Sequence, residues 1–285
     1  MTTRIDAPSN PRIAAAVKAA SSGTSMLLEG RRMIEDALDA GIRIEELFVQ
    51  RDSGEEEKDR EKEEDFLRRV RGGGDTRAKE PAPRVTEVSA RVLRKLSELP
   101  STRGVVALAS PPHRTLASLS SLLPSKKSSS FSSPLFLILD DIQDPANVGA
   151  ILRSGEAFGV SAALLTPGCA SPFSPRALRA SAGSAFRIPI AARVAAREAV
   201  LWAQANGIAL AGAEAHTGAA PEELSGVRPL ALVIGSEGHG ISPELAAALD
   251  HRVTVPLLGR VESLNAAVAA GVLLHILTRR RASPG

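Results

Sequence analysis

The sequence predicts an α/β protein made of two domains, and three observations carry this expectation. Apolar segments of strand length alternate with helical segments along most of the chain. A Pro/Ser-rich stretch divides this alternation into two parts. At 285 residues the chain is also long enough to bury two cores. Because aromatic residues make up only 3% of the sequence, those cores must pack from Ala, Leu, Val and Ile.

The first domain is expected over residues 8–112. A helix beginning at Pro11, a helix ended by Gly41 and apolar strands at 44–50 and 104–110 make up a small α/β unit. Residues 51–83 break the pattern, because their dense mixed charge and glycine run cannot bury enough surface to form a core element. We expect a charged, flexible surface insertion there, helical in part at most.

A second α/β domain is expected over residues 134–282. Residues 113–133 are rich in Pro and Ser and should form the linker that precedes it. Strands separated by helices of ordinary length imply a mostly parallel sheet with helices on both faces. Such sheets bind ligands in the loops at the carboxyl ends of their strands.

Composition excludes several classes of protein. Cys169 is the only cysteine, which rules out an internal disulfide, and the five histidines lack metal-ligand spacing. No apolar run approaches the roughly 20 residues of a membrane span, and the N-terminus lacks the apolar core of a secretory signal. The net charge of +3 is mild, although arginines gathered on one face would suit a polyanion. We therefore expect a metal-free protein of the cytoplasm.

The segment DDIQDPANVGAILRSGEAFG directly follows the predicted strand at 135–139. Asp144 or Asn147 can cap the helix that begins here, and Gly149 allows close backbone approach. Arg153 comes six residues after Asn147, close to two helical turns, so both side chains can point to one side. A capped helix with a solvated Arg153 and Glu156 fits this spacing as well as a ligand site does.

The segment LALVIGSEGHGIS places three glycines and an acid after another buried strand. Gly235, Gly238 and Gly240 allow a backbone cradle around a ligand, and Glu237 lies inside that tight loop. The pattern matches neither the phosphate loop nor the dinucleotide fingerprint, which argues against a nucleotide-dependent enzyme.

The segment VTVPLLGRVESLNAAVAAGVLLHIL predicts a strand, a turn and a long helix with Ser263 as its N-cap. Glu262, Ser263 and Asn265 cluster at the helix start, where backbone N–H groups and the helix dipole favour an anionic or carboxylate-bearing ligand. The apolar residues of this helix are expected in the core or at a subunit interface; they are Val268, Leu273, Leu274 and Leu277.

Taken in order, DPANVGAILRS, VIGSEGHGIS and VPLLGRVESLNAAVA resemble the three motifs of the SpoU/TrmH family of RNA ribose 2′-O-methyltransferases. The segments LLEGRRMIEDALDAG and VTEVSARVLRKLSELPSTRGVVAL are similar to the ribosomal-protein-like RNA-binding domain that precedes the catalytic domain in many members. The resemblance covers most of the chain, but not the charged insertion or the Ser-rich linker.

The resemblance implies a SPOUT fold with a C-terminal trefoil knot and a homodimer with its active site near the subunit interface. It implies that the knot loops bind S-adenosylmethionine in a bent form. The residues that carry over to this cofactor site are Gly235, Val255, Leu264, Gly238, Leu257 and Gly259. The N-terminal domain is of the type found in enzymes that modify ribosomal RNA, so ribosomal RNA is the expected substrate.

The resemblance also assigns the catalytic residues. Arg153 is expected to bind the adjacent phosphate and orient the ribose hydroxyl, since an arginine is normally fully protonated. The alternative is that it acts as a base in a site that strongly lowers its pKa, and the proton acceptor is left open. The residues expected to hold Arg153, the RNA and the cofactor in place are Asn147, Glu237, Ser263 and Asn265. The sequence departs from the common family pattern at Ala266 and Ala267. The alternatives are a catalytically inactive knotted RNA-binding or ribosome-assembly factor and an enzyme that acts on tRNA.

Overall fold

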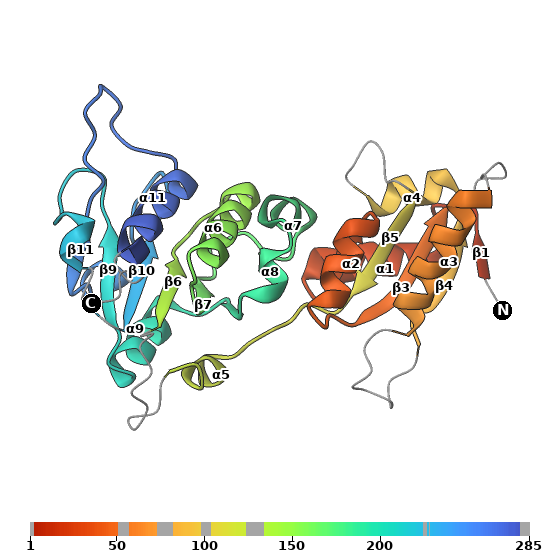
Figure 1. Ribbon diagram of the computed structural model, residues 1–285, viewed down its shortest axis with the longest axis horizontal. Coiled ribbons are helices and arrows are strands. Elements are labelled where there is room, and N and C mark those ends of the chain that lie inside the picture. Colours follow the sequence, from red (N-terminus) through yellow and green to blue (C-terminus); the bar gives the residue numbers. More distant parts are fainter. Residues whose placement is uncertain are drawn as a thin grey trace. The chain divides into compact units, whose positions relative to one another are not determined.

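The computed structural model divides the chain into two compact units, with the boundary between Pro112 and His113. It describes residues 3–50, 57–72, 82–97, 104–123, 134–224, 227 and 229–279. Each unit is an α/β structure with its own sheet (Figure 1). Across those residues, we find no helix with the length and apolar character needed to span a membrane.

The N-terminal unit is built on a mixed five-stranded sheet. Its order is β1 (Thr3–Ile5), β4 (Arg84–Val88), β3 (Ile44–Gln50), β5 (Val105–Ala109) and β2 (Met26–Glu29). The strands β1, β4 and β3 run parallel, whereas β5 is antiparallel to both of its neighbours. The expected domain start at residue 8 is too late, because Thr3–Ile5 pair with β4 as an edge strand.

Four helices accompany this sheet: α1 (Pro11–Ser22), α2 (Arg31–Asp39), α3 (Glu57–Arg71) and α4 (Ala90–Leu96). The helix α1 begins as the sequence predicts, with Pro11 in its first turn and the Asn10 side chain accepting the Arg12 N–H. It ends at Gly23, whose φ of 76° is a left-handed conformation that glycine adopts without strain.

The charged insertion is helical in part, as expected, but the end of its helix α3 is packed rather than flexible. Phe66 and Val70 of α3 are only 4% and 2% exposed. The Arg31 guanidinium lies 4.7 Å from the centroid of the Phe66 ring, and Arg69 forms an ion pair with Asp39 of α2. Two buried apolar residues at helical spacing, with the half-buried Leu67 between them, therefore fix a helix whose other residues are charged. The rest of the insertion lies outside the described residues.

The second unit contains a six-stranded sheet in which every strand pair is parallel, as the sequence predicts. Its order is β11 (His251–Val253), β9 (Ala209–Ala213), β10 (Leu230–Ile234), β6 (Leu135–Leu139), β7 (Ala162–Leu165) and β8 (Ile190–Ala192). Because all the strands point the same way, their carboxyl ends share one edge of the sheet. The loops that follow β6, β9 and β10 therefore meet there.

Helices cover both faces of this sheet, which confirms the predicted architecture (Figure 1). They are α5 (Leu116–Ser120), α6 (Pro145–Ala157), α7 (Pro175–Ser181), α8 (Ser184–Arg187), α9 (Ala196–Ala205), α10 (Pro243–Ala246) and α11 (Ala266–Arg279), with a 3₁₀ turn, η1, at Pro221–Leu224. On one face α5, α9 and α10 share a core in which the Phe136 and Trp202 rings meet edge to face, with centroids 5.2 Å apart. On the other face α6 packs against α11.

The first part of the expected linker belongs to this second unit. Leu119 of α5 is 1% exposed in the core, and the Trp202 indole N–H donates to Ser120 Oγ at 3.0 Å. The backbone N–H of Arg114 also donates to Ile190 O at 3.2 Å. Burial of one leucine and a hydrogen bond to a buried indole therefore order a segment whose composition predicts a linker. Residues 124–133 lie outside the described part of the chain.

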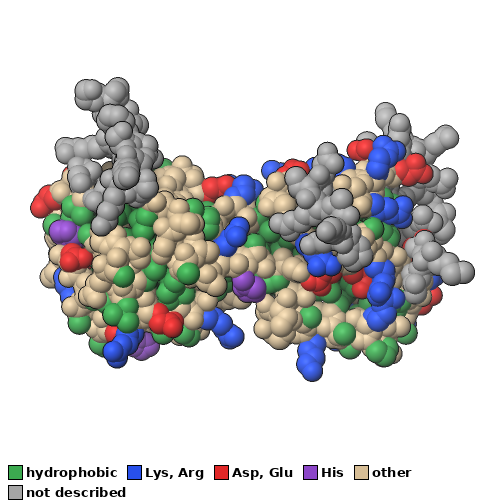
Figure 2. All heavy atoms as spheres, turned by 90° about the horizontal axis from the view of Figure 1, so that it is seen from below, with side chains coloured by type: hydrophobic (Ala, Val, Ile, Leu, Met, Phe, Trp, Pro, Cys, Tyr) green, Lys and Arg blue, Asp and Glu red, His purple; other side chains and the backbone are tan. Residues whose placement is uncertain are grey.

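The surface of each unit mixes charge types. Figure 2 shows acidic, basic and apolar side chains interspersed over the visible face, without a large patch of one kind. Single exposed apolar side chains of this sort are ordinary on a protein surface. The functional site is therefore best sought in cavities and polar networks at the carboxyl edge of the sheet.

Candidate active site

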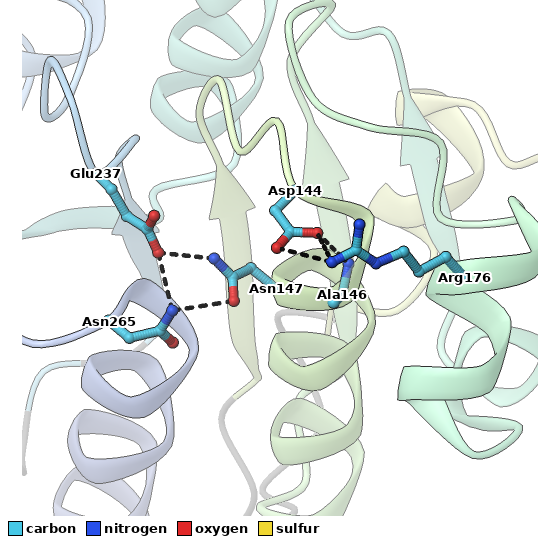
Figure 3. A network of polar contacts seen from close by, with 6 residues as sticks. All are labelled: Asp144, Ala146, Asn147, Arg176, Glu237 and Asn265. Carbon is cyan, nitrogen blue, oxygen red and sulfur yellow. Dashed lines mark hydrogen bonds and ion pairs between the residues drawn. The ribbon is translucent and has the colours of Figure 1, made fainter.

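Residues from all three sequence motifs form one hydrogen-bonded network at the carboxyl edge of the six-stranded sheet (Figure 3). Asn147 lies in the first turn of α6, Glu237 lies in the loop after β10, and Asn265 directly precedes α11. Asn147 Nδ2 donates to Glu237 Oε1 at 2.7 Å. Asn265 Nδ2 donates to Asn147 Oδ1 at 3.1 Å and to Glu237 Oε1 at 2.9 Å.

The orientation of both amides follows from the carboxylate between them. A carboxylate only accepts hydrogen bonds, so the nitrogen of each amide must face Glu237. Asn147 Oδ1 is then left to accept from Asn265. Asn265 Oδ1 is left for the helix, where it accepts the backbone N–H groups of Ala267 and Val268 at 2.9 and 3.3 Å. The network therefore has one self-consistent arrangement and ties α6 to α11.

These bonds make Asn265, rather than Ser263, the N-cap of the last helix. Asn265 accepts from the second and third helical residues, which is the usual geometry of an N-cap. Ser263 lies two residues earlier and is exposed on the wall of a cavity. Both residue types cap helices, and the contact with Glu237 places Asn265 at the cap in this chain.

The loop after β10 is held tightly by its own backbone. Ser236 and Gly240 exchange two backbone hydrogen bonds of 3.0 and 2.9 Å across the loop. A Cβ atom on Gly235 would lie 2.3 Å from the Gly240 carbonyl carbon, so only glycine fits there. The buried Asp140 carboxylate accepts the Ser242 N–H at 2.7 Å, which fastens the far end of the loop to the end of β6. The loop that presents Glu237 is thus fixed at both ends.

A second loop clamps the segment that leads into α6. Cys169 Sγ donates to Leu139 O at 3.1 Å and accepts the Ile142 N–H at 3.3 Å. Thr166 Oγ1 accepts the N–H of Asp141, whose φ of 56° is left-handed and unusual for a residue other than glycine. Burial raises the pKa of the Cys169 thiol, which keeps it protonated as a donor. No pattern in the sequence predicts that Cys169 and Thr166 take part.

A cavity of about 450 Å³ lies beside the network. Five of the six residues expected to bind the cofactor line it, namely Gly235, Gly238, Val255, Leu257 and Leu264. Gly259 does not line it, so that expectation is not met by the structure. The α11 residues Ala266, Ala269 and Leu273 complete an apolar part of the wall. Its size is within the range of cavities that hold cofactors.

The acidic side chains of this cavity outnumber the basic ones, although Glu214 is paired with Arg252. Its lining includes the carboxylates of Glu214, Glu237 and Glu262, and it includes no Lys or Arg. Such a lining favours a ligand that carries positive charge and disfavours a polyphosphate. Sequence reasoning did not single out Glu214 or His216 on this wall. The signal was their position directly after the strand β9, at the ligand-binding edge of a parallel sheet.

A smaller cavity of about 200 Å³ adjoins the other side of the network. Asn147, Gln143 and Asp144 line it, together with the loop that carries Glu237. Glu237 borders both cavities. A ligand in the larger cavity and a group entering the smaller one would therefore meet at this network.

Arg153 lies apart from the network that was expected to hold it. Its side chain is exposed on α6, and it makes no hydrogen bond or ion pair to any residue within the described ranges. Asn147, Glu237 and Asn265 bond to one another instead. The guanidinium is therefore accessible to a ligand that arrives from solvent.

Asp144 and Glu156, the other two charged residues considered for a site in this segment, have structural roles. Asp144 caps α6 by accepting the Ala146 N–H at 2.9 Å and lies 3.3 Å from the Arg176 guanidinium (Figure 3). Glu156, expected as a solvated charge, instead forms a two-bond ion pair with Arg187 of α8. That pairing lowers the pKa of the Glu156 carboxyl despite partial burial.

Comparison with known proteins places this geometry in a family. The SpoU rRNA methylase family model matches residues 134–275, and a model of an MRM3-like substrate-binding domain matches residues 21–107. An uncharacterized tRNA/rRNA methyltransferase of Mycobacterium leprae is 41% identical over 148 residues, or 52% of this chain and 48% of that protein. The chain thus spans about half the length of the curated relatives it matches.

Solved structures cover the whole chain. A crystal structure of an RNA 2′-O ribose methyltransferase is 31% identical, with a TM-score of 0.71 and coverage of 98% of this chain and 99% of that one. The SpoU methyltransferase AviRb from Streptomyces viridochromogenes, solved in complex with AdoMet, is 25% identical, with a TM-score of 0.76 and coverage of 95% and 99%. The three motifs, the parallel sheet and these similarities show that the chain belongs to the SpoU rRNA methylase family.

Proposed function

We propose that this chain transfers a methyl group from S-adenosylmethionine to a ribose 2′-hydroxyl of structured ribosomal RNA. The observation that carries the proposal is the Asn147–Glu237–Asn265 network beside a cavity lined by the motif loops. Family membership and the named activity of the 31% identical structure support a methyltransferase that acts on RNA.

The large cavity fits S-adenosylmethionine by charge and shape. This cofactor carries a sulfonium, an ammonium and a carboxylate group, so its net charge is positive, and the cavity wall offers Glu237 and Glu262 as well as Glu214, which is paired with Arg252. Val255, Leu257 and Leu264 offer apolar contact for a base, and the backbone at Gly235 and Gly238 allows close approach. When bound, the cofactor supplies an electrophilic methyl group for direct displacement. The AdoMet complex of AviRb supports this assignment.

The chain's own residues contribute position and electrostatics. The network fixes the ends of α6 and α11 against the loop of Glu237, so the walls of both cavities keep a single geometry. Arg153 is exposed and free of ion pairs in the described residues, so its guanidinium can bind a phosphate next to the reacting ribose. Because a guanidinium stays protonated, Arg153 orients the hydroxyl rather than removing its proton.

RNA binding is assigned to the N-terminal unit as part of the same proposal. The match of residues 21–107 to a substrate-binding domain supports this assignment. We also propose a homodimer; Val268, on the first turns of α11 beside Asn265, is 52% exposed and offers an apolar contact for a second copy. The other apolar residues of that helix, Leu273, Leu274 and Leu277, lie in the core. Sedimentation of the full chain tests this, with a mass of two chains expected.

Methyl transfer from labelled S-adenosylmethionine tests the proposed reaction. Unmodified ribosomal RNA and tRNA are offered separately, and the labelled nucleoside is identified after complete digestion. A 2′-O-methylnucleoside from ribosomal RNA supports the proposal. Label in tRNA alone would show that tRNA, and not ribosomal RNA, is the substrate. Cofactor binding without transfer to either RNA would favour an assembly factor over an enzyme.

A further inference from the structure

The helices α1 and α4 form one outer layer of the N-terminal unit. Ile13 and Ala16 of α1 are buried in the same cluster as Val92 and Leu93 of α4, over Phe48 of β3. Their opposite sides therefore face away from the sheet. The side chain of Arg12, in the first turn of α1, points to the sheet. There its guanidinium donates to Thr86 Oγ1 at 3.1 Å and pairs with Glu46.

The outward side of this layer carries cations and no acid. Arg91, Arg94 and Lys95 of α4 are exposed, and their spacing of three and four residues places them on one side of the helix. Lys18 of α1 is exposed as well. Neither helix contains an Asp or Glu. None of the four cations has an ion pair or hydrogen bond with a residue that the structure describes.

The helix α3 differs from this layer, because two of its exposed arginines already face acids. Arg69 of α3 pairs with Glu35 and Asp39 of α2, and Arg68 pairs with Asp65 of its own helix. A helix whose cations already face acids gains little from a nearby polyanion. Exposed cations without a partner among the described residues also occur singly at Arg32, Arg71 and Arg84, whereas α4 carries three of them on one side.

The same unit lacks the side chains that stack on bases. Residues 1–112 contain two aromatic residues, Phe48 and Phe66, and they are 0% and 4% exposed. Recognition of unpaired bases depends largely on stacking against aromatic side chains. The lack of exposed aromatic side chains favours phosphate contacts and the shape of an RNA double helix as the means of recognition.

We propose that the α1–α4 face binds the phosphate backbone of double-helical RNA through Lys18, Arg91, Arg94 and Lys95. This rests on the proposed function, because the bound RNA is the substrate delivered to the site in the second unit. The binding depends on shape and charge rather than on base sequence. Residues of α3 do not take part in it.

The test compares two triple variants of the full chain with equal change in charge. One replaces the α4 cations (Arg91→Gln, Arg94→Gln, Lys95→Gln), and the other replaces three cations of α3 (Arg68→Gln, Arg69→Gln, Arg71→Gln). The probes are a ribosomal RNA hairpin and a single strand of equal length, titrated by fluorescence anisotropy at several salt concentrations. Thermal unfolding and S-adenosylmethionine affinity of both variants serve as controls for folding and for the second unit.

The α4 variant should bind the hairpin at least ~10-fold more weakly, with a salt dependence reduced by about 2–3 in log–log slope for three lost phosphate contacts. The α3 variant should bind within about twofold of wild type, because Arg68 and Arg69 already face acids and only Arg71 loses a charge that has no partner in the described residues. Both should bind S-adenosylmethionine as wild type does. Wild type should prefer the hairpin to the single strand.

An α4 variant that binds like wild type, or an equal loss in the α3 variant, overturns the inference. Preference for the single strand overturns the part that concerns shape. If hairpin binding depends on α4 but no RNA is methylated, the proposed function fails and this surface stands. If the α4 substitutions leave methylation unchanged at limiting RNA, the proposed function stands and the inference about this surface fails.

Discussion

Asn147 and Glu237 are 90 residues apart in the sequence, yet Asn147 Nδ2 lies 2.7 Å from Glu237 Oε1. That oxygen also accepts from the Asn265 side chain and from the Ala266 backbone, at 2.9 and 3.4 Å. One carboxylate oxygen thus joins the starts of two helices to the loop after β10.

Replacing Glu237 with Ala should lower kcat/KM by about 10- to 100-fold, because loss of hydrogen bonds to a charged group costs about 1.5–3 kcal/mol. Glu237→Gln should lose less, since its amide oxygen can still accept from Asn147 and Asn265. Asn147→Asp, nearly identical in shape, should lose more than Glu237→Gln because two carboxylates would face each other. Steady-state methylation kinetics measure the order. If all three variants methylate RNA at the wild-type rate, the network is not needed for the reaction.

Replacing Gly235 with Ala should abolish binding of S-adenosylmethionine, because the new Cβ would lie 2.3 Å from the Gly240 backbone and force the loop to move. Gly259→Ala is the matched control. A Cβ there meets nothing within 4 Å, and Gly259 does not line the cavity. Calorimetric titration of each folded variant measures the affinity. If Gly259→Ala loses affinity while Gly235→Ala keeps it, the cavity has been assigned to the wrong loops.

Cys169→Ala should destabilise the fold by about 1–3 kcal/mol, because it leaves the buried Ile142 N–H without its acceptor. Cys169→Ser should retain more stability, since a hydroxyl can make both hydrogen bonds. Denaturant unfolding measures the difference. If the alanine and serine variants unfold alike, the thiol contributes packing alone.

The Cys169 thiol also predicts a dependence on high pH. Its pKa is raised by burial, so as pH rises the unfolded chain ionises before the folded chain does. The folded state should therefore lose stability as pH rises past the ordinary thiol pKa, and Cys169→Ser should lose less over that range. Alkylation of the native thiol should correspondingly be slow at neutral pH. Rapid labelling of the folded chain there would contradict the raised pKa.

The Glu156–Arg187 pair should give an acid-dependent contribution to stability. The pKa of Glu156 is lowered mainly by its hydrogen bond to Arg187. The contribution is therefore present above the ordinary carboxyl pKa and is lost as pH falls from there through the lowered pKa of the folded state. Glu156→Gln should remove this dependence and cost at most about 1 kcal/mol near neutral pH, because the pair is partly exposed. Thermal unfolding from pH 7 to pH 3, about the range over which carboxyls titrate, provides the measurement. If the stability of Glu156→Gln depends on acidic pH as wild type does, other carboxyl groups cause that dependence.

Much of the fold follows from local patterns in the sequence. The alternation of strands and helices after Pro134 gives the parallel sheet, because parallel strands need helical crossovers. The same pattern locates the site loops, since ligands bind at the carboxyl ends of such strands. The family motifs then single out Asn147, Glu237 and Asn265, which the structure brings together.

The parts that sequence analysis missed depend on contacts between distant residues. Glu156 and Arg187 are 31 residues apart, and nothing local marks them as partners. Ser263 and Asn265 are both good caps, and contact with Glu237 decides between them. The packing of α3 depends on a few apolar residues, Phe66, Leu67 and Val70, among many charges. The trefoil knot, the homodimer and the cytoplasmic location stay predictions.

We propose methyl transfer to a ribose hydroxyl with Arg153 as the residue that binds the neighbouring phosphate, and labelling of RNA by wild type and Arg153→Ala tests both parts. Wild type and Arg153→Ala are incubated with labelled S-adenosylmethionine and unmodified ribosomal RNA, and the labelled nucleosides are identified by mass spectrometry. We predict a 2′-O-methylnucleoside with wild type and none with Arg153→Ala, while both bind the cofactor with similar affinity. A methylated base, or full activity of Arg153→Ala, would contradict the account.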